Sequence, residues 1–248
     1  MQPADSPSAS IDHAAARRHF ARGFAHIATL PALILFASMI GFAGLAKDTG
    51  FSLCEALFMT AIVWALPAQV VLIGSILSGA TLAGAALAVG LSSVRLMPMV
   101  VALLPEMRGP KTRRASLFLA THFIAVTAWV IANEHVRAIP RDHRIVWFLG
   151  VGFGLCSGAL TTITAVYLVS AAMPPFVLGA LFMITPIYFL TSLWTTAREA
   201  SGYMAIVAGL VLAPLFHAVA PQFDLLLSGA VGGVGAYLVG RARRRRAP

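Results

Sequence analysis

Charged residues are scarce in this sequence. Lys, Arg, Asp and Glu together make up 11% of its 248 residues, whereas 59% are hydrophobic and the mean hydropathy is +0.85. An ordinary soluble domain carries about 25% charged residues, with which it covers its water-facing surface. This composition excludes a soluble globular protein and is typical of an integral membrane protein.

Acidic residues and cysteines are scarcer still, with nine Asp and Glu and two Cys. Cys54 and Cys156 lie in or beside apolar runs, without a C-x-x-C pair or a nearby histidine set, so neither a disulfide framework nor a zinc site is expected. The Walker A, G-x-S-x-G and H-E-x-x-H motifs are missing. A membrane-embedded enzyme would need clustered carboxylates or histidines, and both residue types are scarce in this sequence. We therefore expect no enzymatic activity, no cofactor and no metal.

The apolar residues form runs long enough for bilayer-spanning helices, which need about 20 residues each. The sequence predicts an all-α, polytopic helix bundle. Its predicted parts are a partly disordered cytoplasmic segment at 1–26, a transmembrane domain at 27–240 and a basic tail at 241–248. About eight spans are predicted, at 27–46, 53–78, 80–104, 115–133, 145–170, 175–195, 202–220 and 224–240.

Basic residues gather at both ends of the chain and in a few short loops. No aromatic-interleaved surface accompanies them, so they indicate cytoplasmic flanks and no nucleic-acid partner. With both termini inside, twelve Lys and Arg face the cytoplasm and five face outward. This count predicts that both termini of a multi-pass membrane protein are cytoplasmic, and we expect that membrane to be the bacterial inner (plasma) membrane. The basic loop 108–114 falls outside in this topology, whereas a re-entrant segment within 53–104, leaving seven spans, would move it inside.

Two of the apolar runs, both within 53–104, are interrupted near their middles. Proline removes a backbone donor and breaks or kinks a helix. In a bilayer, carbonyls freed in this way persist only where they are buried in protein or line a wet cavity. Paired interruptions of this kind are typical of the midplane binding site of a transporter. The interrupting residues, which we predict to bind substrate, are Trp64, Pro67, Gln69, Ser92, Ser93 and Arg95.

Arg95 and Gln69 each have two interpretations. An arginine inside an apolar run costs about 2.5–3.5 kcal/mol. It is either a fixed cation for an anionic group such as an α-carboxylate, or it lies near an interface where its side chain reaches water. Gln69 either faces a substrate at the start of a half-helix, where anionic groups are favoured, or bonds across to another helix.

Two titratable residues and one repeated tetrapeptide remain. His122 lies in an apolar run and could carry protons, although a hydrogen-bonded structural histidine is the more frequent case. Glu55 lies close to a predicted helix start, where capping is the simpler role. The sequence ALFM at 56–59 recurs at 180–183, which leaves an internal duplication open.

Four short motifs occur in order between residues 50 and 123. They are G-F-S-L-C-E-A-L-F at 50–58, W-A-L-P-A-Q at 64–69, Val94-Arg95, and Thr121. This series resembles the AzlC family of branched-chain amino acid permeases, whose members read G-F-S-x-x-E-x-x-F, a Y-A-G-A-S-Q-F-like segment, N/D-x-R-H and T-D-E. The resemblance implies export of branched-chain or similar small neutral amino acids, with a small membrane partner of the AzlD type.

Glu55, Gln69 and Arg95 match residues of the family motifs. The sequence departs from the motifs elsewhere, with Ser93 in place of Asn or Asp, and with His122 where the first acid of T-D-E would stand. His122 is therefore a candidate for proton coupling, together with Glu55. The alternatives are a carrier of another small organic anion or metabolite, and a non-transporting membrane scaffold or accessory subunit.

Overall fold

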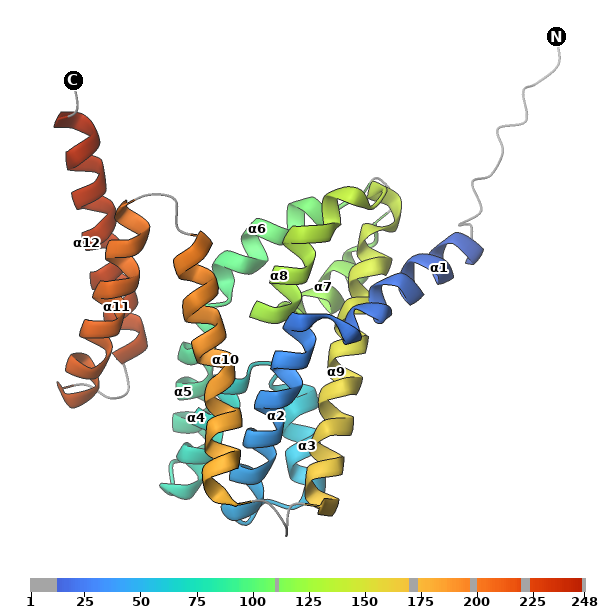
Figure 1. Cartoon of the computed structure of the whole chain (residues 1–248), viewed down its shortest axis with the longest axis horizontal. Coiled ribbons are helices and arrows are strands. Elements are labelled where there is room, and N and C mark those ends of the chain that lie inside the picture. Colours follow the sequence, from blue (N-terminus) through green and yellow to red (C-terminus); the bar gives the residue numbers. More distant parts are fainter. Residues whose placement is uncertain (1–12, 110–111, 170–173, 197–199, 220–223, 247–248) are drawn as a thin grey trace. The chain divides into compact units, whose positions relative to one another are not determined.

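The computed structural model describes residues 13–109, 112–169, 174–196, 200–219 and 224–246 (Figure 1). Within these ranges the regular structure is helical throughout, as the sequence predicts. The elements are α1 (His13–Phe24), η1 (Ala25–Ala28), α2 (Leu30–Asp48), α3 (Leu53–Ile62), α4 (Leu66–Leu77), α5 (Leu82–Val94), α6 (Met97–Met107), α7 (Arg114–His122), α8 (Val126–His135), η2 (Val136–Ala138), η3 (Arg141–His143), α9 (Arg144–Val169), α10 (Pro175–Thr196), α11 (Ala200–Val219) and α12 (Asp224–Arg246).

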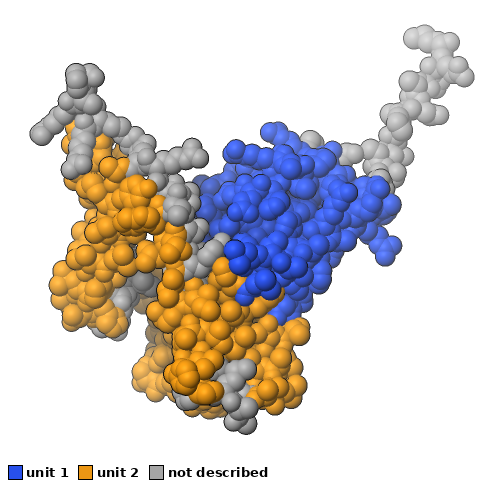
Figure 2. Space-filling view, in the orientation of Figure 1, with its two compact units in different colours: residues 1–33, 98–158 blue, residues 34–97, 159–248 orange. Residues whose placement is uncertain are grey.

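The chain divides into two compact units (Figure 2). Unit 1 consists of Met1–Leu33 and Pro98–Gly158, and unit 2 of Ile34–Met97 and Ala159–Pro248. Because α2 and α9 run from one unit into the other, this division differs from the sequence-based one. The C-terminal basic residues also continue α12 as far as Arg246 rather than forming a separate tail. The part of the predicted disordered segment at 1–12 lies outside the described residues.

Fewer helices than predicted can each cross a membrane. Among the described residues, three are long and apolar enough: Leu30–Asp48, Arg141–Val169 and Ala200–Val219. A fourth span results if α5 and α6, which are bent at a short break, count as one. The predicted span 53–78 contains α3 and α4, and the predicted span 115–133 is covered by α7 and α8. The structure thus supports a membrane helix bundle but not a count of eight spans.

In unit 2, α3 and α4 form a hairpin. Ser52 and Glu55 close a capping box at the start of α3, which satisfies otherwise unpaired backbone donors. Residues 63–65 are not helical, and Pro67 lies in the first turn of α4, where its missing N–H costs nothing. The turns at 49–52 and 78–81 lie at the same end of unit 2 (Figure 1). The chain therefore enters and leaves this hairpin at the same end, as in the re-entrant alternative for 53–104.

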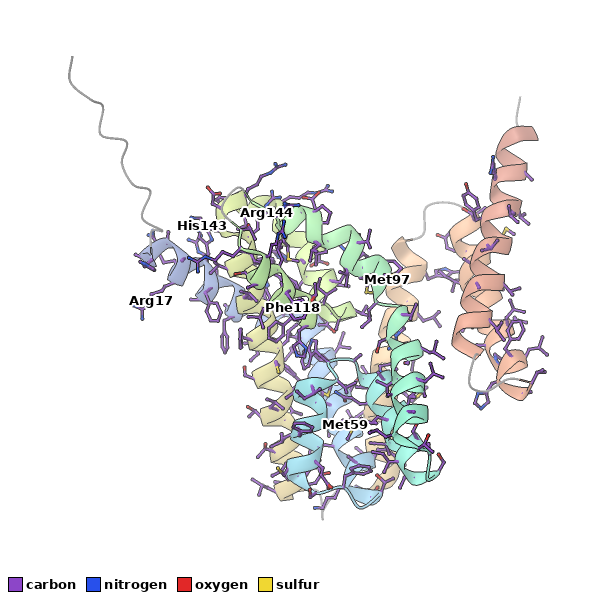
Figure 3. The ribbon with its side chains drawn as sticks, turned by 180° about the vertical axis from the view of Figure 1, so that it is seen from behind. Arg17, Met59, Met97, Phe118, His143 and Arg144 are labelled. Carbon is purple, nitrogen blue, oxygen red and sulfur yellow. The ribbon has the colours of Figure 1, made fainter. Side chains whose placement is uncertain are left out.

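Contacts in unit 2 hold this end of the hairpin to the end of α9. The Tyr167 hydroxyl donates to the carbonyl of Phe51 at 2.9 Å, and the Lys47 ammonium donates to the carbonyl of Tyr167 at 3.1 Å. Met59, labelled in Figure 3, lies in the core of unit 2. After α4, the chain turns at Gly79, whose φ of +69° suits glycine, and α5 packs back against α4.

In unit 1, α7 and α8 form a second hairpin. The Arg144 guanidinium donates to the carbonyls of Glu106 and Ile139, both at 2.9 Å. A Cβ atom on Gly109 would lie 2.7 Å from the carbonyl oxygen of Arg141. The residues before α7 and after α8 therefore lie together beside the start of α9, where Figure 3 labels Arg144.

This second hairpin corrects the predicted topology. With 9 and 10 residues, α7 and α8 are only about 14–15 Å long, about half of a bilayer core of roughly 30 Å. The run at 115–133 therefore does not cross as one span, and the two basic loops that flank it lie at one end of unit 1 instead of on opposite sides of a span.

Helix α1 packs closely on the first half of α9 within unit 1. A Cβ on Gly23 would collide with the carbonyl of Trp147, and a Cβ on Gly150 would collide with the carbonyl of Phe20. Small residues allow helix backbones to approach in this way. The described part of the predicted N-terminal segment is thus a docked helix.

The repeated tetrapeptide does not mark equivalent elements. Residues 56–59 lie in a 10-residue helix that ends at a break, whereas residues 180–183 lie inside the 22-residue helix α10.

Candidate functional site

The break between α3 and α4 has a defined hydrogen-bond structure. The amide of Val63 donates to Met59 at 2.7 Å, and the amide of Ala65 donates to the carbonyl of Val63 at 2.8 Å. The Gln69 side chain reaches back across the break and donates from Nε2 to the same Val63 carbonyl at 2.8 Å. The negative end of the α3 dipole and the positive end of the α4 dipole both lie at this break.

Four buried polar atoms in this part of unit 2 have no hydrogen-bond partner among the described residues. They are Thr60 Oγ1, Trp64 Nε1, Gln69 Oε1 and Ser92 Oγ. Thr60 and Gln69 are 0% exposed, Ser92 is 4% and Trp64 is 7% exposed. Leaving a buried polar group unpaired costs about 1–3 kcal/mol. Such groups near a helix break are therefore suited to pair with a polar ligand.

Ser92 belongs to this group because of the register of the α4–α5 hairpin. Gln69 precedes Leu77, the end of α4, by eight residues, and Ser92 follows Leu82, the start of α5, by ten. At about 1.5 Å per residue, both lie roughly 12–15 Å from the connecting turn. The structure thus brings Ser92 to the depth of the α3–α4 break. We refer to Thr60, Trp64, Gln69 and Ser92 as the polar break.

The other residues predicted for substrate binding differ from these. Ser93 donates its hydroxyl to the Val89 carbonyl one turn earlier, at 2.8 Å, and is thereby satisfied inside its own helix. Arg95 caps the C-terminal end of α5 and its side chain is exposed, with no hydrogen bond or ion pair to any described residue. Pro67 is exposed in the first turn of α4.

The two residues predicted for proton coupling do not join the polar break. Glu55 is exposed, and its carboxylate accepts hydrogen bonds from the Ser52 amide at 2.8 Å and the Ser52 hydroxyl at 2.7 Å, so it has a capping role. His122 ends α7 and is exposed, with its ring edge-on to Phe123 at 5.1 Å between centroids.

Sequence reasoning missed Thr60. The signal was present, because Thr60 is a hydroxyl residue in an apolar run four residues before Trp64. The Val63 carbonyl was also missed, since no side-chain pattern identifies a backbone acceptor.

Unit 1 contains two pairs of histidines. The rings of His19 and His143 stack with their centroids 4.5 Å apart, and those of His26 and His135 lie 4.6 Å apart. Burial, followed by the charge of His135, lowers the pKa of His26 below its ordinary value of 6.5. No three His, Cys, Asp or Glu residues gather into a metal-binding group in the described ranges.

An open groove in unit 2 is a weaker candidate for a binding site. It has a volume of about 440 Å³ and is lined mostly by apolar residues of α3 and α9. Its polar residues include Thr164, whose hydroxyl already donates to the Leu160 carbonyl. None of the predicted site residues lines it.

Comparison with known proteins gives one match. The family model described as AzlC protein matches residues 31–173, which include both hairpins and all of α9. No curated protein and no solved structure matches the chain. Because the matched segment is more than half of the chain, this protein belongs to the AzlC family.

Proposed function

We propose that this protein exports small neutral amino acids of the branched-chain type and recognises them at the polar break of unit 2. The apolar helices and the AzlC family together indicate a membrane transport protein. The substrate class and the direction of transport are our proposal.

The observation that carries the proposal is the mixture of donors and acceptors in the polar break. The Nε2 atom of Gln69 already donates to the Val63 carbonyl, and its Oε1 atom has no partner among the described residues. Because Oε1 is a carbonyl oxygen, it can accept a hydrogen bond but cannot donate one. Trp64 Nε1 can only donate, and the hydroxyls of Thr60 and Ser92 can do either. An ammonium group needs acceptors and a carboxylate needs donors, so a zwitterion satisfies both kinds of atom.

The helix ends favour the same ligand. Carbonyls at the C-terminal end of α3 attract a cation, and amides at the N-terminal end of α4 attract an anion. Broken membrane helices use their ends in this way to bind charged groups near the midplane. A net-neutral ligand with one group of each sign is matched to the break.

Arg95 is our candidate for a second carboxylate contact. It lies near the middle of the α5–α6 segment, about 12 residues from either end. That distance is on the order of 18 Å measured along the two helices, more than half of a hydrocarbon core of roughly 30 Å, so the proposal places Arg95 near the membrane midplane. A guanidinium at this depth needs an anionic or polar partner, and a substrate carboxylate would supply one.

The remaining parts of the proposal concern coupling, location and partner. His122 is the proposed proton carrier, because it is an exposed imidazole at a helix end in unit 1. We place the protein in the bacterial inner membrane with both termini in the cytoplasm. A small AzlD-type subunit is the proposed partner, on the basis of family membership.

The test is counterflow of labelled amino acids into liposomes that contain the purified chain, alone and with an AzlD-type subunit. We expect leucine, isoleucine and valine to exchange, whereas aspartate and lysine should not. Exchange of a branched monocarboxylate that lacks the ammonium group, in preference to leucine, would favour the organic-anion alternative. No exchange and no ligand-induced thermal stabilisation in either preparation would favour the scaffold alternative.

A further inference from the structure

We infer that the family region is an inverted repeat of two re-entrant hairpins, with α3–α4 opening to the outer side of the membrane and α7–α8 opening to the cytoplasm. The two hairpins correspond at a constant offset of 60 residues.

The backbone of the two breaks supports this correspondence. In the first, Ala65 donates to the carbonyl of Val63 at 2.8 Å. In the second, Ala125 donates to the carbonyl of Phe123 at 2.9 Å. Each alanine is also the N-cap of the helix that follows. Both breaks are three residues long, and the helices before them have 10 and 9 residues.

The side chains show the same offset. Leu57-Phe58 corresponds to Leu117-Phe118, Ala65 to Ala125 and Ala68 to Ala128. Ala68 and Ala128 are both 0% exposed.

The next correspondence extends to polar atoms. Gln69 corresponds to Trp129, and each carries a buried polar atom, Oε1 or Nε1, without a partner among the described residues. The second hairpin therefore resembles the first in its unpaired polar group as well as in its backbone.

The opposite sidedness follows from the chain between the hairpins. The first hairpin enters and leaves at one end of unit 2, and the second enters and leaves at one end of unit 1. They are joined by α5 and α6, which together are long and apolar enough to cross a membrane once when the bent pair is counted as one span. One crossing between two re-entrant hairpins places their open ends on opposite sides of the membrane.

The distribution of basic residues agrees with this topology when α10 and α12, which are not among the helices long and apolar enough by themselves, are also taken to cross. If α2, α5–α6 and α9 to α12 each cross once, the N-terminal segment, the loops at 108–114 and 137–144, Arg198 and the C-terminal arginines all face the cytoplasm. Sixteen Lys and Arg then lie inside and only Lys47 lies outside, with Arg95 within the membrane. The eight-span topology gives twelve against five. Since cytoplasmic loops carry the excess of Lys and Arg, the inverted repeat fits better.

The test is labelling of single cysteines in intact cells with a membrane-impermeant maleimide, in a Cys54→Ala, Cys156→Ala background. Ser78→Cys lies where the chain leaves the first hairpin, at the end of α4, and Ala115→Cys lies where the chain enters the second hairpin, at the start of α7. Both native residues are exposed. Asp48→Cys and Ala138→Cys are matched controls, because both topologies place the first outside and the second inside.

We expect Ser78→Cys to be labelled in intact cells, as Asp48→Cys is, and Ala115→Cys only after the membrane is opened, as Ala138→Cys is. The eight-span topology predicts the reverse for both test positions. Labelling of the two test positions from the same side would also overturn the inverted repeat. Ala80→Cys and Thr112→Cys replace any test variant that fails to reach the membrane. The readout needs no transport, so it does not depend on the proposed function.

Discussion

The side-chain amide of Gln69 donates a 2.8 Å hydrogen bond to the backbone carbonyl of Val63, across the break between α3 and α4. This bond joins the first turn of one half-helix to the end of the other. It adds a second donor to a carbonyl that already accepts from the Ala65 amide, and it leaves Oε1 of Gln69 as a buried acceptor. The residue therefore both stabilises the break and presents a ligand group.

Replacement of Gln69 by leucine should reduce transport at matched protein levels. The change removes the free acceptor Oε1 that we propose for the substrate, while the Val63 carbonyl keeps the hydrogen bond from the Ala65 amide. Loss of a buried hydrogen bond to a charged ligand group costs about 1–3 kcal/mol, which is roughly 5- to 150-fold in affinity. Counterflow of leucine measures the loss. Unchanged flux in Gln69→Leu would show that the substrate does not bind at the polar break.

Ser92 and Ser93 form a matched pair of neighbours. The hydroxyl of Ser92 is buried and unpaired, whereas that of Ser93 is bonded to Val89 within α5. We expect Ser92→Ala to weaken substrate binding by about 1 kcal/mol and Ser93→Ala to leave it almost unchanged. Binding isotherms of the two variants provide the comparison. Equal effects would mean that the free hydroxyl has no ligand role.

Arg95→Lys separates the two interpretations of the arginine. A guanidinium binds a carboxylate through two parallel hydrogen bonds that lysine cannot reproduce. Loss of a desolvated charge partner costs about 2–5 kcal/mol, so flux should fall well over tenfold while the protein still inserts. Near-normal flux would instead identify Arg95 as a cation that need only be long and charged.

Gly150→Ala should destabilise the docking of α1. The new Cβ would collide with the carbonyl of Phe20, and relief of such overlap costs about 1–3 kcal/mol. Gly209→Ala in α11 is the control, because a Cβ there meets nothing within 4 Å. Thermal unfolding in detergent should show a lower midpoint for the first variant only. A similar midpoint for both would contradict the close α1–α9 contact.

Acidification should destabilise unit 1 through its histidine pairs. Burial and the charge of His135 lower the pKa of His26 in the folded chain, and burial and the charge of His143 lower that of His19. As the pH falls through 6.5, the unfolded chain binds protons before the folded one does, so stability decreases. It levels off once the pH is below the folded pKa.

Thermal unfolding between about pH 8 and pH 5 measures this effect. His26→Gln should flatten the pH dependence, whereas His13→Gln, at the exposed start of α1, should not. An unaltered slope in His26→Gln would assign the pH dependence to other groups.

Local chemistry in the sequence determined the class of the protein and the place of its first break. Scarce charge and long apolar runs leave no soluble alternative, because the chain has too few charged residues to cover a water-facing surface. Pro67 cannot continue the helix before it, and Gln69 cannot face lipid, so the interruption near Trp64 follows from these residues alone. The capping role of Glu55 followed in the same way, because a capping box is a local hydrogen-bond pattern.

Only the tertiary structure decided what the chain does at each break. A break at residues 63–65 is compatible with a kinked span or with a reversal, and the choice depends on packing between segments far apart in sequence. The break at 123–125 contains no proline from which it could be predicted. The structure shows that the chain reverses there, because Arg144 at the start of α9 binds both Glu106, which precedes the hairpin, and Ile139, which follows it. Likewise, spacing cannot say which of Ser92 and Ser93 keeps a free hydroxyl, because that depends on which side of α5 is covered.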